Sequence, residues 1–157
     1  MTRAGIGWDS HRLEPDRRLV LGGVEIEGAE RGLAGHSDAD VLTHALIDAL
    51  LGAAGLDDIG RHFPDTDERW RDADSIELLR SVKGLLRDAG FSPLNVDATV
   101  ACEAPKLDGH REAMRSRLAE ALDLDAAAVN VKFTTGERMG VVGRGEGIAA
   151  LAVATLS

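Results

Sequence analysis

The fold is decided by residues 96–135, which read VDATVACEAPKLDGHREAMRSRLAEALDLDAAAVNVKFTT. The two ends of this stretch, 96–102 and 129–135, alternate apolar and polar residues or run apolar, which predicts strands. Between them, residues 112–124 have the apolar spacing of an amphipathic helix. A strand, a helix and a second strand in this order form a crossover, so the two strands are predicted to run parallel in one sheet.

Further helices and strands are predicted on both sides of this crossover. Leucines and alanines at helical spacing predict a helix over 38–54, with Ser37 as its N-cap and Asp40 at its third position. A second helix is predicted over 75–89, because Asp74 supplies a start signal before the apolar positions. Short strands are predicted at 3–9 and 19–26, and a last strand at 147–156.

This order of elements predicts an α+β fold with a mixed β-sheet and helices on one face. The other face of the sheet is then free to meet a partner subunit. A length of 157 residues fits one domain, so we expect residues 1–157 to form a single unit.

Composition excludes several classes of function. With 18 Lys and Arg against 27 Asp and Glu, the formal net charge is −9 at pH 7, which repels nucleic acids and anionic membranes. Aromatic residues make up only 3% of the chain, and no apolar run is long enough to span a bilayer, so neither nucleic acid nor membrane is an expected partner. Cys102 is the only cysteine, which excludes an internal disulfide and favours a cytoplasmic location.

Asp9, His11 and His44 form a candidate metal site. Asp9 and His11 are two residues apart at the end of a predicted strand, so both side chains leave the same face. His44 lies on the polar side of the predicted helix, and the three residues together make a plausible zinc site with one position open for substrate. On these residues alone the simpler interpretation stands, in which His11 caps a strand, His44 is solvated and Asp9 forms a turn.

Three further stretches offer groups that bind phosphate. His36 and Ser37 precede a predicted helix, where free backbone N–H groups favour an anion, although Ser37 can serve as a plain cap as well. The segments 103–106 (EAPK) and 134–137 (TTGE) end strands and offer a lysine to phosphate and a carboxylate to Mg²⁺. The segment 143–147 (GRGEG) matches no phosphate-loop pattern and is typical of a glycine-rich turn.

In their order along the chain, these segments resemble the family of 2-C-methyl-D-erythritol 2,4-cyclodiphosphate synthases of the non-mevalonate isoprenoid pathway. The resemblance spans nearly the whole chain. It is carried by the segments GWDSHRL, HSDADVLTHALIDALLGAAGLDDIG, FPDTD, ADS, NVD, EAPK, VNVKFTT and GRGEG.

The resemblance implies a homotrimer that packs its sheets around the threefold axis, with an active site at each subunit interface. It implies a metal-dependent cyclase, a phosphorus–oxygen lyase that converts 4-diphosphocytidyl-2-C-methyl-D-erythritol 2-phosphate into the 2,4-cyclodiphosphate and CMP. In this reaction the 2-phosphate attacks the β phosphorus in line. The implied cofactors are Zn²⁺ or another divalent ion at Asp9, His11 and His44, and Mg²⁺ or Mn²⁺ held by Glu137 with the substrate diphosphate.

The resemblance also implies the residues that contact the substrate. His36 and Thr135 match the transition-state stabilisers of the family. The substrate-binding positions match Asp9, Ser10, His11, His36, Ser37, Asp58, Ile59, Gly60, Phe63, Pro64, Asp65, Thr66, Asp67, Cys102, Glu103, Ala104, Pro105, Lys106, Leu107, Asp108, Thr134, Thr135, Gly136, Glu137, Val141 and Arg144.

Two alternatives from other classes remain open to the sequence. A zinc-dependent phosphohydrolase would use the same three ligands to activate water and would release an open phosphate product. A non-catalytic trimer would bind a cytidine nucleotide without turnover. An isoprenoid diphosphate on the threefold axis, near Arg144 and Glu146, is a further partner that the sequence leaves open.

Overall fold

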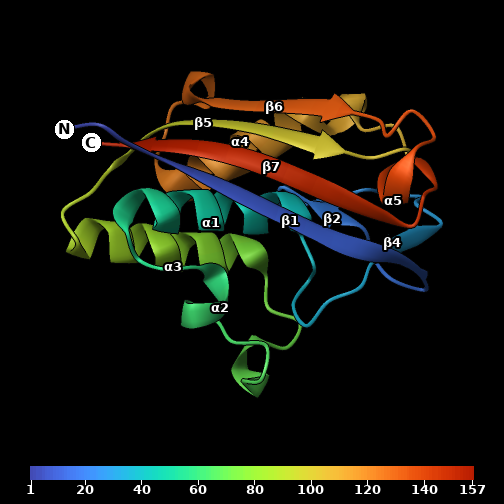
Figure 1. Ribbon diagram of the computed structural model, residues 1–157, viewed down its shortest axis with the longest axis horizontal. Coiled ribbons are helices and arrows are strands. Elements are labelled where there is room, and N and C mark those ends of the chain that lie inside the picture. Colours follow the sequence, from blue (N-terminus) through green and yellow to red (C-terminus); the bar gives the residue numbers. More distant parts are fainter.

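A five-stranded mixed sheet forms one layer of the computed structural model, which describes residues 1–157 (Figure 1). The strand order is β4-β1-β7-β5-β6, in which β5 and β6 are parallel and all other neighbours are antiparallel. The predicted mixed sheet and its parallel crossover are therefore confirmed. The strands are β1 (Arg3–Pro15), β4 (Arg31–Leu33), β5 (Pro93–Ala101), β6 (Val129–Thr134) and β7 (Gly147–Leu156).

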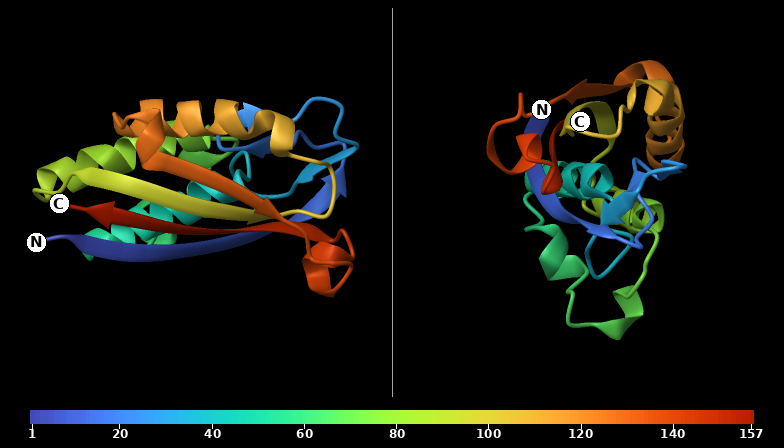
Figure 2. Two further views of the ribbon diagram at one scale, coloured as in Figure 1. Left: turned by 90° about the horizontal axis from the view of Figure 1, so that it is seen from above. Right: turned by 90° about the vertical axis from the view of Figure 1, so that its right-hand side faces the viewer.

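Three long helices cover one face of this sheet (Figure 2). They are α1 (Val41–Ala54), α3 (Ser75–Asp88) and α4 (Arg111–Leu122). The buried apolar side chains of these helices, of the sheet and of some connecting segments form one cluster of 38 residues. Short elements complete the connections: α2 (Ile59–His62), α5 (Gly140–Gly143) and single 3₁₀ turns at Glu68–Trp70, Asp108–His110 and Ala126–Ala128.

The central helix α1 lies directly on β1, because two glycines of the strand remove the side chains between them. A Cβ built on Gly7 would lie 1.8 Å from the carbonyl oxygen of Ala45, and one built on Gly5 would lie 2.1 Å from that of Ala49. Helix α1 is therefore buried on almost every side, and 12 of its 14 residues are buried. This close approach brings the first turns of α1 against the middle of β1.

The start of α1 differs from the prediction, because Asp40 and not Ser37 is the N-cap. The backbone of Ala39 has a φ of +56°, which breaks the helical path before residue 40. The fully buried carboxylate of Asp40 accepts hydrogen bonds from Thr43 N at 3.0 Å, Gly22 N at 2.9 Å and Gly23 N at 2.7 Å. Asp40 therefore fixes the start of the helix to a neighbouring turn.

That turn also explains why the strand predicted at 19–26 is wrong. Gly22 and Gly23 both have positive φ values, so the chain reverses there and forms a small hairpin of β2 (Val20–Leu21) and β3 (Val24–Glu25). Strand β1 is, in turn, longer than predicted, because it continues beyond residue 9 to Pro15 by pairing with β7 and β4.

The face of the sheet opposite the helices carries exposed apolar side chains. Ile6 and Trp8 on β1 are 68% and 60% exposed, and Leu151 and Val153 on the neighbouring β7 are each 40% exposed. No helix of the structure combines the length and the apolar character that crossing a bilayer requires.

Candidate active site

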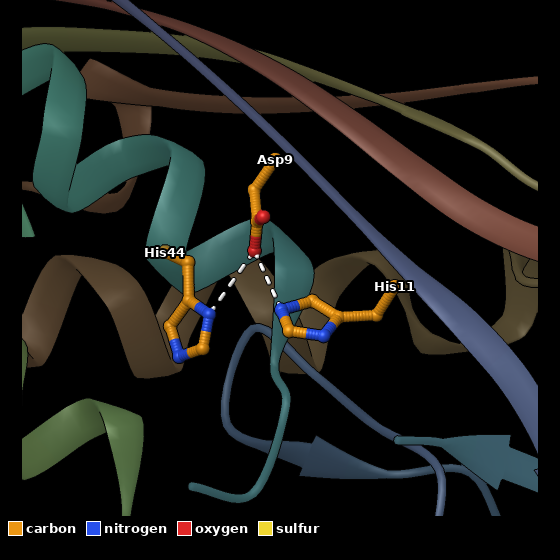
Figure 3. A group of neighbouring side chains, drawn as sticks. All are labelled: Asp9, His11 and His44. Atoms are coloured by element: carbon orange, nitrogen blue, oxygen red, sulfur yellow. Dashed lines mark hydrogen bonds and ion pairs between the residues drawn. The ribbon is translucent and has the colours of Figure 1, made fainter. Parts of the chain in front are cut away.

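Asp9, His11 and His44 converge where β1 passes the first turns of α1 (Figure 3). Alternation along β1 places Asp9 and His11 on the same face as Gly7, toward the helix. The Oδ2 atom of Asp9 lies 2.9 Å from Nε2 of His11 and 3.1 Å from Nδ1 of His44. One possible ligand atom from each residue lies within 4.8 Å of the other two, so the three residues could together hold a metal ion.

The hydrogen bond on the far side of His11 prepares this residue as a metal ligand. Nδ1 of His11 lies 2.7 Å from the carbonyl oxygen of Ala34, which can only accept, so Nδ1 carries the hydrogen. The Nε2 lone pair of His11 therefore points at the Asp9 carboxylate, and a cation is needed between them. Metal-bound histidines are oriented in this way by the partner of their second nitrogen.

The charged groups around Asp9 favour the ionised form of its carboxyl group, which is the form that binds a metal ion. Burial by itself would raise the pKa of Asp9, but hydrogen bonds and positive charge from His11 and His44 outweigh it and hold this pKa well below its usual range. Burial likewise opposes the charge of His11, but the bond to Asp9 raises the pKa of His11 above its ordinary value. The carboxylate of Asp9 and the ring of His11 therefore stabilise each other's charged forms.

The second nitrogen of His44 contacts two hydroxyl groups. Nε2 of His44 lies 2.8 Å from Oγ of Ser75 and 3.2 Å from Oγ of Ser37. The Ser75 hydroxyl in turn donates to the carboxylate of Asp38. The sequence interpretation missed Ser75 and Asp38 as site residues. Sequence analysis used Ser75 only as the start of a predicted helix and as part of the ADS segment of the family resemblance.

The three ligands lie in the wall of a cavity of about 460 Å³. Residues of α2 and of the loop that follows it contribute to the lining of this cavity; both segments lie below α1 in Figure 1. The predicted site residues that line it are Asp9, His11, His36, Ser37, His44, Ile59, Gly60, Phe63, Pro64 and Asp65, joined by Gly35, Asp48, Trp70 and Leu78. The metal half of the predicted site is thus assembled within one chain.

Two of these lining residues are held by their neighbours. Nε2 of His36 donates toward the carbonyl oxygen of Asp67 at 3.2 Å, which ties the loop before α1 to the loop after α2. Asp48 accepts a hydrogen bond from Ile59 N at 2.7 Å, while burial raises the pKa of its carboxyl group. Neither Asp48 nor Trp70 was predicted from the sequence.

The predicted loop residues beside the cavity serve mainly as caps. Asp58 accepts from Arg61 N at 3.0 Å at the start of α2, and Asp67 accepts from Arg69 N at 3.0 Å. Thr66 is exposed in the same loop. These three residues follow or precede the lining segment without lining the cavity themselves.

The predicted nucleotide-binding residues, 102–108 and 134–137, lie elsewhere, at the ends of the parallel strands β5 and β6. Cys102 N donates to Thr134 O at 2.9 Å, which joins the two segments. Across the sheet, Ser10 pairs with Ala149, Ala149 with Ala101, and Ala101 with Thr134. At about 4.8 Å per strand, these segments lie roughly 14 Å from the metal ligands of β1. One chain therefore does not bring the two halves of the predicted site together.

Hydrogen bonds stabilise the two predicted nucleotide-binding segments, 102–108 and 134–137. Glu103 accepts from Gly136 N at 3.0 Å, and Thr135 Oγ1 donates to the Glu137 carboxylate at 2.8 Å. A Cβ at residue 136 would lie 2.4 Å from Gly143 N, so the tight turn requires glycine there. Burial raises the pKa of the Cys102 thiol to about 11, which suits a packed residue and not a nucleophile.

The remaining predicted residues are Ser10 on the outer face of the sheet, and Val141 and Arg144 in and directly after α5. Ser10 points away from the metal ligands, because it alternates with Asp9 and His11 along β1. Together with Trp8, Met139 and Val141, Ser10 lines a second cavity of about 510 Å³. Arg144 donates to Glu146 at 2.5 Å beside this cavity.

Fold and site together define an α+β protein with a candidate Asp-His-His metal site in the wall of a cavity of about 460 Å³. Residues 2–157 match the YgbB family, and the chain belongs to this family. It is 54% identical, over 98% of each chain, to the 2-C-methyl-D-erythritol 2,4-cyclodiphosphate synthase of Alkaliphilus oremlandii. It is 59% identical, over 97% of its length, to a bifunctional enzyme IspD/IspF of an Anaeromyxobacter species, of which it spans 39%.

Solved structures agree with this assignment. A 2C-methyl-D-erythritol-2,4-cyclodiphosphate synthase in its CDP-bound form matches 99% of this chain with all of its own, at a TM-score of 0.90 and 39% identity. The CDP complex of IspF from Plasmodium falciparum matches 99% of this chain with 95% of its own, at a TM-score of 0.86 and 31% identity. The family resemblance seen in the sequence is thereby confirmed.

Proposed function

We propose that this chain acts as a single cyclodiphosphate synthase domain over residues 1–157. It converts 4-diphosphocytidyl-2-C-methyl-D-erythritol 2-phosphate into 2-C-methyl-D-erythritol 2,4-cyclodiphosphate and CMP. The observation that carries the proposal is the convergence of Asp9, His11 and His44 in the wall of the 460 Å³ cavity. Membership of the YgbB family and the names of its relatives support the same reaction.

The chemistry needs positioning more than a protein nucleophile. The 2-phosphate oxygen of the substrate is already anionic, so the chain has to hold it in line with the β phosphorus. The lining of the cavity by His36, Ser37 and the loop 63–65 suits this task, because it combines hydrogen-bond donors with an apolar wall. We assign His36 and Thr135 as donors to the charge that grows in the transition state.

The donor set fits a divalent ion, because a carboxylate and two imidazoles are ligands that Zn²⁺ accepts. A zinc ion at Asp9, His11 and His44 would act as a Lewis acid toward a phosphate oxygen. Glu137 is exposed at the end of the nucleotide segment, where its carboxylate can hold Mg²⁺ or Mn²⁺ together with substrate phosphates.

We further propose that the chain works as a homotrimer with sheets packed around the threefold axis. Two observations support this assembly: the roughly 14 Å that separates the two halves of the site, and the exposed apolar face of β1 and β7. In a trimer, the metal ligands of one subunit would meet the nucleotide segments of its neighbour. The CDP complexes of related proteins support a cytidine nucleotide as ligand.

Two smaller proposals concern the outer cavity and the location of the protein. The cavity lined by Trp8, Ser10 and Val141 would lie toward the threefold axis, where an isoprenoid diphosphate could bind near Arg144. We propose a cytoplasmic location, supported by the single cysteine, Cys102, which can form no internal disulfide.

Phosphorus NMR of the protein with the cytidyl substrate, Zn²⁺ and Mg²⁺ tests the reaction. We expect the cyclic diphosphate and CMP from the wild type, and their loss in His44→Ala, because the variant lacks one of three metal ligands. His110→Ala, which removes a histidine outside the cavity, serves as the control and should retain turnover. CMP with an open phosphate product would identify a phosphohydrolase instead, and no turnover by the metal-loaded trimer would identify a binding protein.

A further inference from the structure

Behind His44 lies a chain of polar groups, Ser75 and Asp38, to which neither the family resemblance nor the proposed reaction assigns a role. Ser75, the first residue of α3, is fully buried, and its Oγ lies 2.8 Å from Nε2 of His44. The same hydroxyl contacts the carboxylate of Asp38, which also accepts from Ser75 N at 2.9 Å. A hydrogen-bonded chain thus runs from His44 on α1 through Ser75 on α3 to Asp38 in the loop before α1.

The direction of these hydrogen bonds follows from the chemistry of each group. An ionised carboxylate only accepts, so the single hydroxyl hydrogen of Ser75 points to Asp38. Toward His44 the same oxygen can then only accept, and Nε2 of His44 must donate. With its hydrogen on Nε2, the neutral imidazole keeps a lone pair on Nδ1, the atom that faces Asp9 at 3.1 Å.

We propose that Asp38 and Ser75 are positioning residues, which fix His44 in the tautomer and orientation that present Nδ1 to the metal. The inference rests on the metal site of the proposed function, and it assigns to this site two residues that act through His44. Outer partners of this kind orient metal-binding histidines and raise their basicity.

The position of Asp38 makes this chain rigid. Its Oδ1 atom accepts from Asp40 N at 3.2 Å, and its own N–H donates to Ala73 O at 3.1 Å. Asp38 therefore joins the loop before α1 to the start of α3, and the His44 ring is held from both sides. Ser37 Oγ, 3.2 Å from His44 Nε2, offers a second, longer acceptor for the same hydrogen.

Ser75→Ala and Asp38→Asn test the proposal by zinc affinity, measured by competition with a chelating dye. Ser75→Ala removes the hydroxyl that accepts from His44 Nε2 and leaves only Ser37 as acceptor, so we expect zinc affinity to fall about tenfold.

Asp38→Asn replaces the carboxylate, which accepts hydrogen bonds from Ser75, with an amide. If its oxygen keeps the bond to Ser75 N, its NH₂ donates to the Ser75 hydroxyl, which then donates to His44. That reversal moves the imidazole hydrogen to Nδ1, and we expect a fall of about a hundredfold.

Ser81→Ala is the matched control, because Ser81 lies on the same helix, is exposed and contacts only the helix backbone. It should bind zinc as the wild type does. Circular dichroism and urea unfolding establish that each variant is folded. Unchanged zinc affinity in folded Ser75→Ala and Asp38→Asn would overturn the proposal.

A measurement on the wild type remains decisive if a variant fails to fold. In cadmium-substituted, nitrogen-15-labelled protein, we expect one-bond metal coupling to Nδ1 of His44 and to Nε2 of His11. The Nε2 hydrogen of His44 should be protected from exchange and close to the Ser75 side chain in space. Coupling to Nε2 of His44, or rapid exchange of that hydrogen, would overturn the proposal. None of these readouts depends on cyclase activity.

Discussion

At the scale of single residues, a proton and a metal ion would compete for the same nitrogen atom in the candidate metal site. Asp9 stabilises a proton on His11, since the bond between them raises the pKa of His11 against the opposing effect of burial. A metal ion must displace that proton to reach Nε2. Affinity for the metal is therefore linked to pH through His11.

We predict that zinc affinity falls by about tenfold per pH unit once the pH drops below the raised pKa of His11, because one proton competes with the metal. Isothermal titration calorimetry in buffers from neutral to mildly acidic pH measures this slope. A zinc affinity that is constant across this range would contradict the assignment of His11 as a ligand.

In the metal-free protein, acid should act on the contribution of His11 to folding stability in the opposite direction to its action on zinc affinity. This difference provides the control. A histidine whose pKa is raised on folding contributes stability that is fully present below its unfolded value of 6.5. That contribution is lost as the pH rises through the folded pKa. Acid therefore weakens metal binding while His11 favours the folded metal-free state, and urea unfolding at several pH values separates the two effects.

The residues of the site differ in how far the sequence could predict them. Asp9 and His11 are two apart on a strand and His44 lies on a clear helix, so local periodicity places each of these side chains. Ser75 contacts His44 across 31 positions of sequence, and only the packing of α3 on α1 brings them together. Local structure alone explains a serine at the start of a helix, so nothing in the sequence indicated that Ser75 contacts His44.

At the scale of elements, the site depends on how closely α1 approaches β1. The sequence predicts both elements, but the distance between them is set by Gly5 and Gly7, whose missing side chains were not recognised as a packing signal. The N-cap assignment to Ser37 was wrong for a related reason. Asp40 is buried against the Gly22–Gly23 turn, and the spacing of residues near Asp40 in the sequence cannot predict a contact between such distant segments.

We predict that Gly7→Ala destabilises the protein by about 3 kcal/mol or more, because its Cβ would lie 1.8 Å from a backbone oxygen that cannot move alone. The helix must shift outward, which also separates His44 from Asp9, so zinc affinity should fall together with stability. Urea unfolding and zinc titration measure the two effects.

Gly84→Ala is the matched control for this substitution. Gly84 lies within α3, and a Cβ there meets nothing within 4 Å. Alanine in a helix interior is favoured over glycine, so we expect Gly84→Ala to stabilise the protein by about 0.5–1 kcal/mol. Equal destabilisation by both substitutions would show that α1 and β1 do not need their close contact.

At the scale of the whole molecule, one sheet carries both halves of the proposed active site. The metal ligands lie on β1 and α1, while Thr135 and Glu137 follow β6 on the far side of β7 and β5. Strand order could be predicted only in part, because the sequence indicates the parallel pair β5–β6 but not that β7 lies between β1 and β5. That insertion is what separates the two half-sites.

The separation leads to a prediction about mixed subunits. His44→Ala disables the metal half and Glu137→Ala the other half, so each variant alone should be inactive as a homotrimer. If sites form between subunits, trimers refolded from an equal mixture contain interfaces that pair an intact His44 with an intact Glu137 of the neighbour. With random assembly, roughly a quarter of the interfaces meet this condition, and about that fraction of wild-type activity should return.

Light scattering on the wild type should give a molecular mass three times that of one chain. Activity that stays absent in the mixed trimers would place the complete site within one chain, which the roughly 14 Å between its halves argues against.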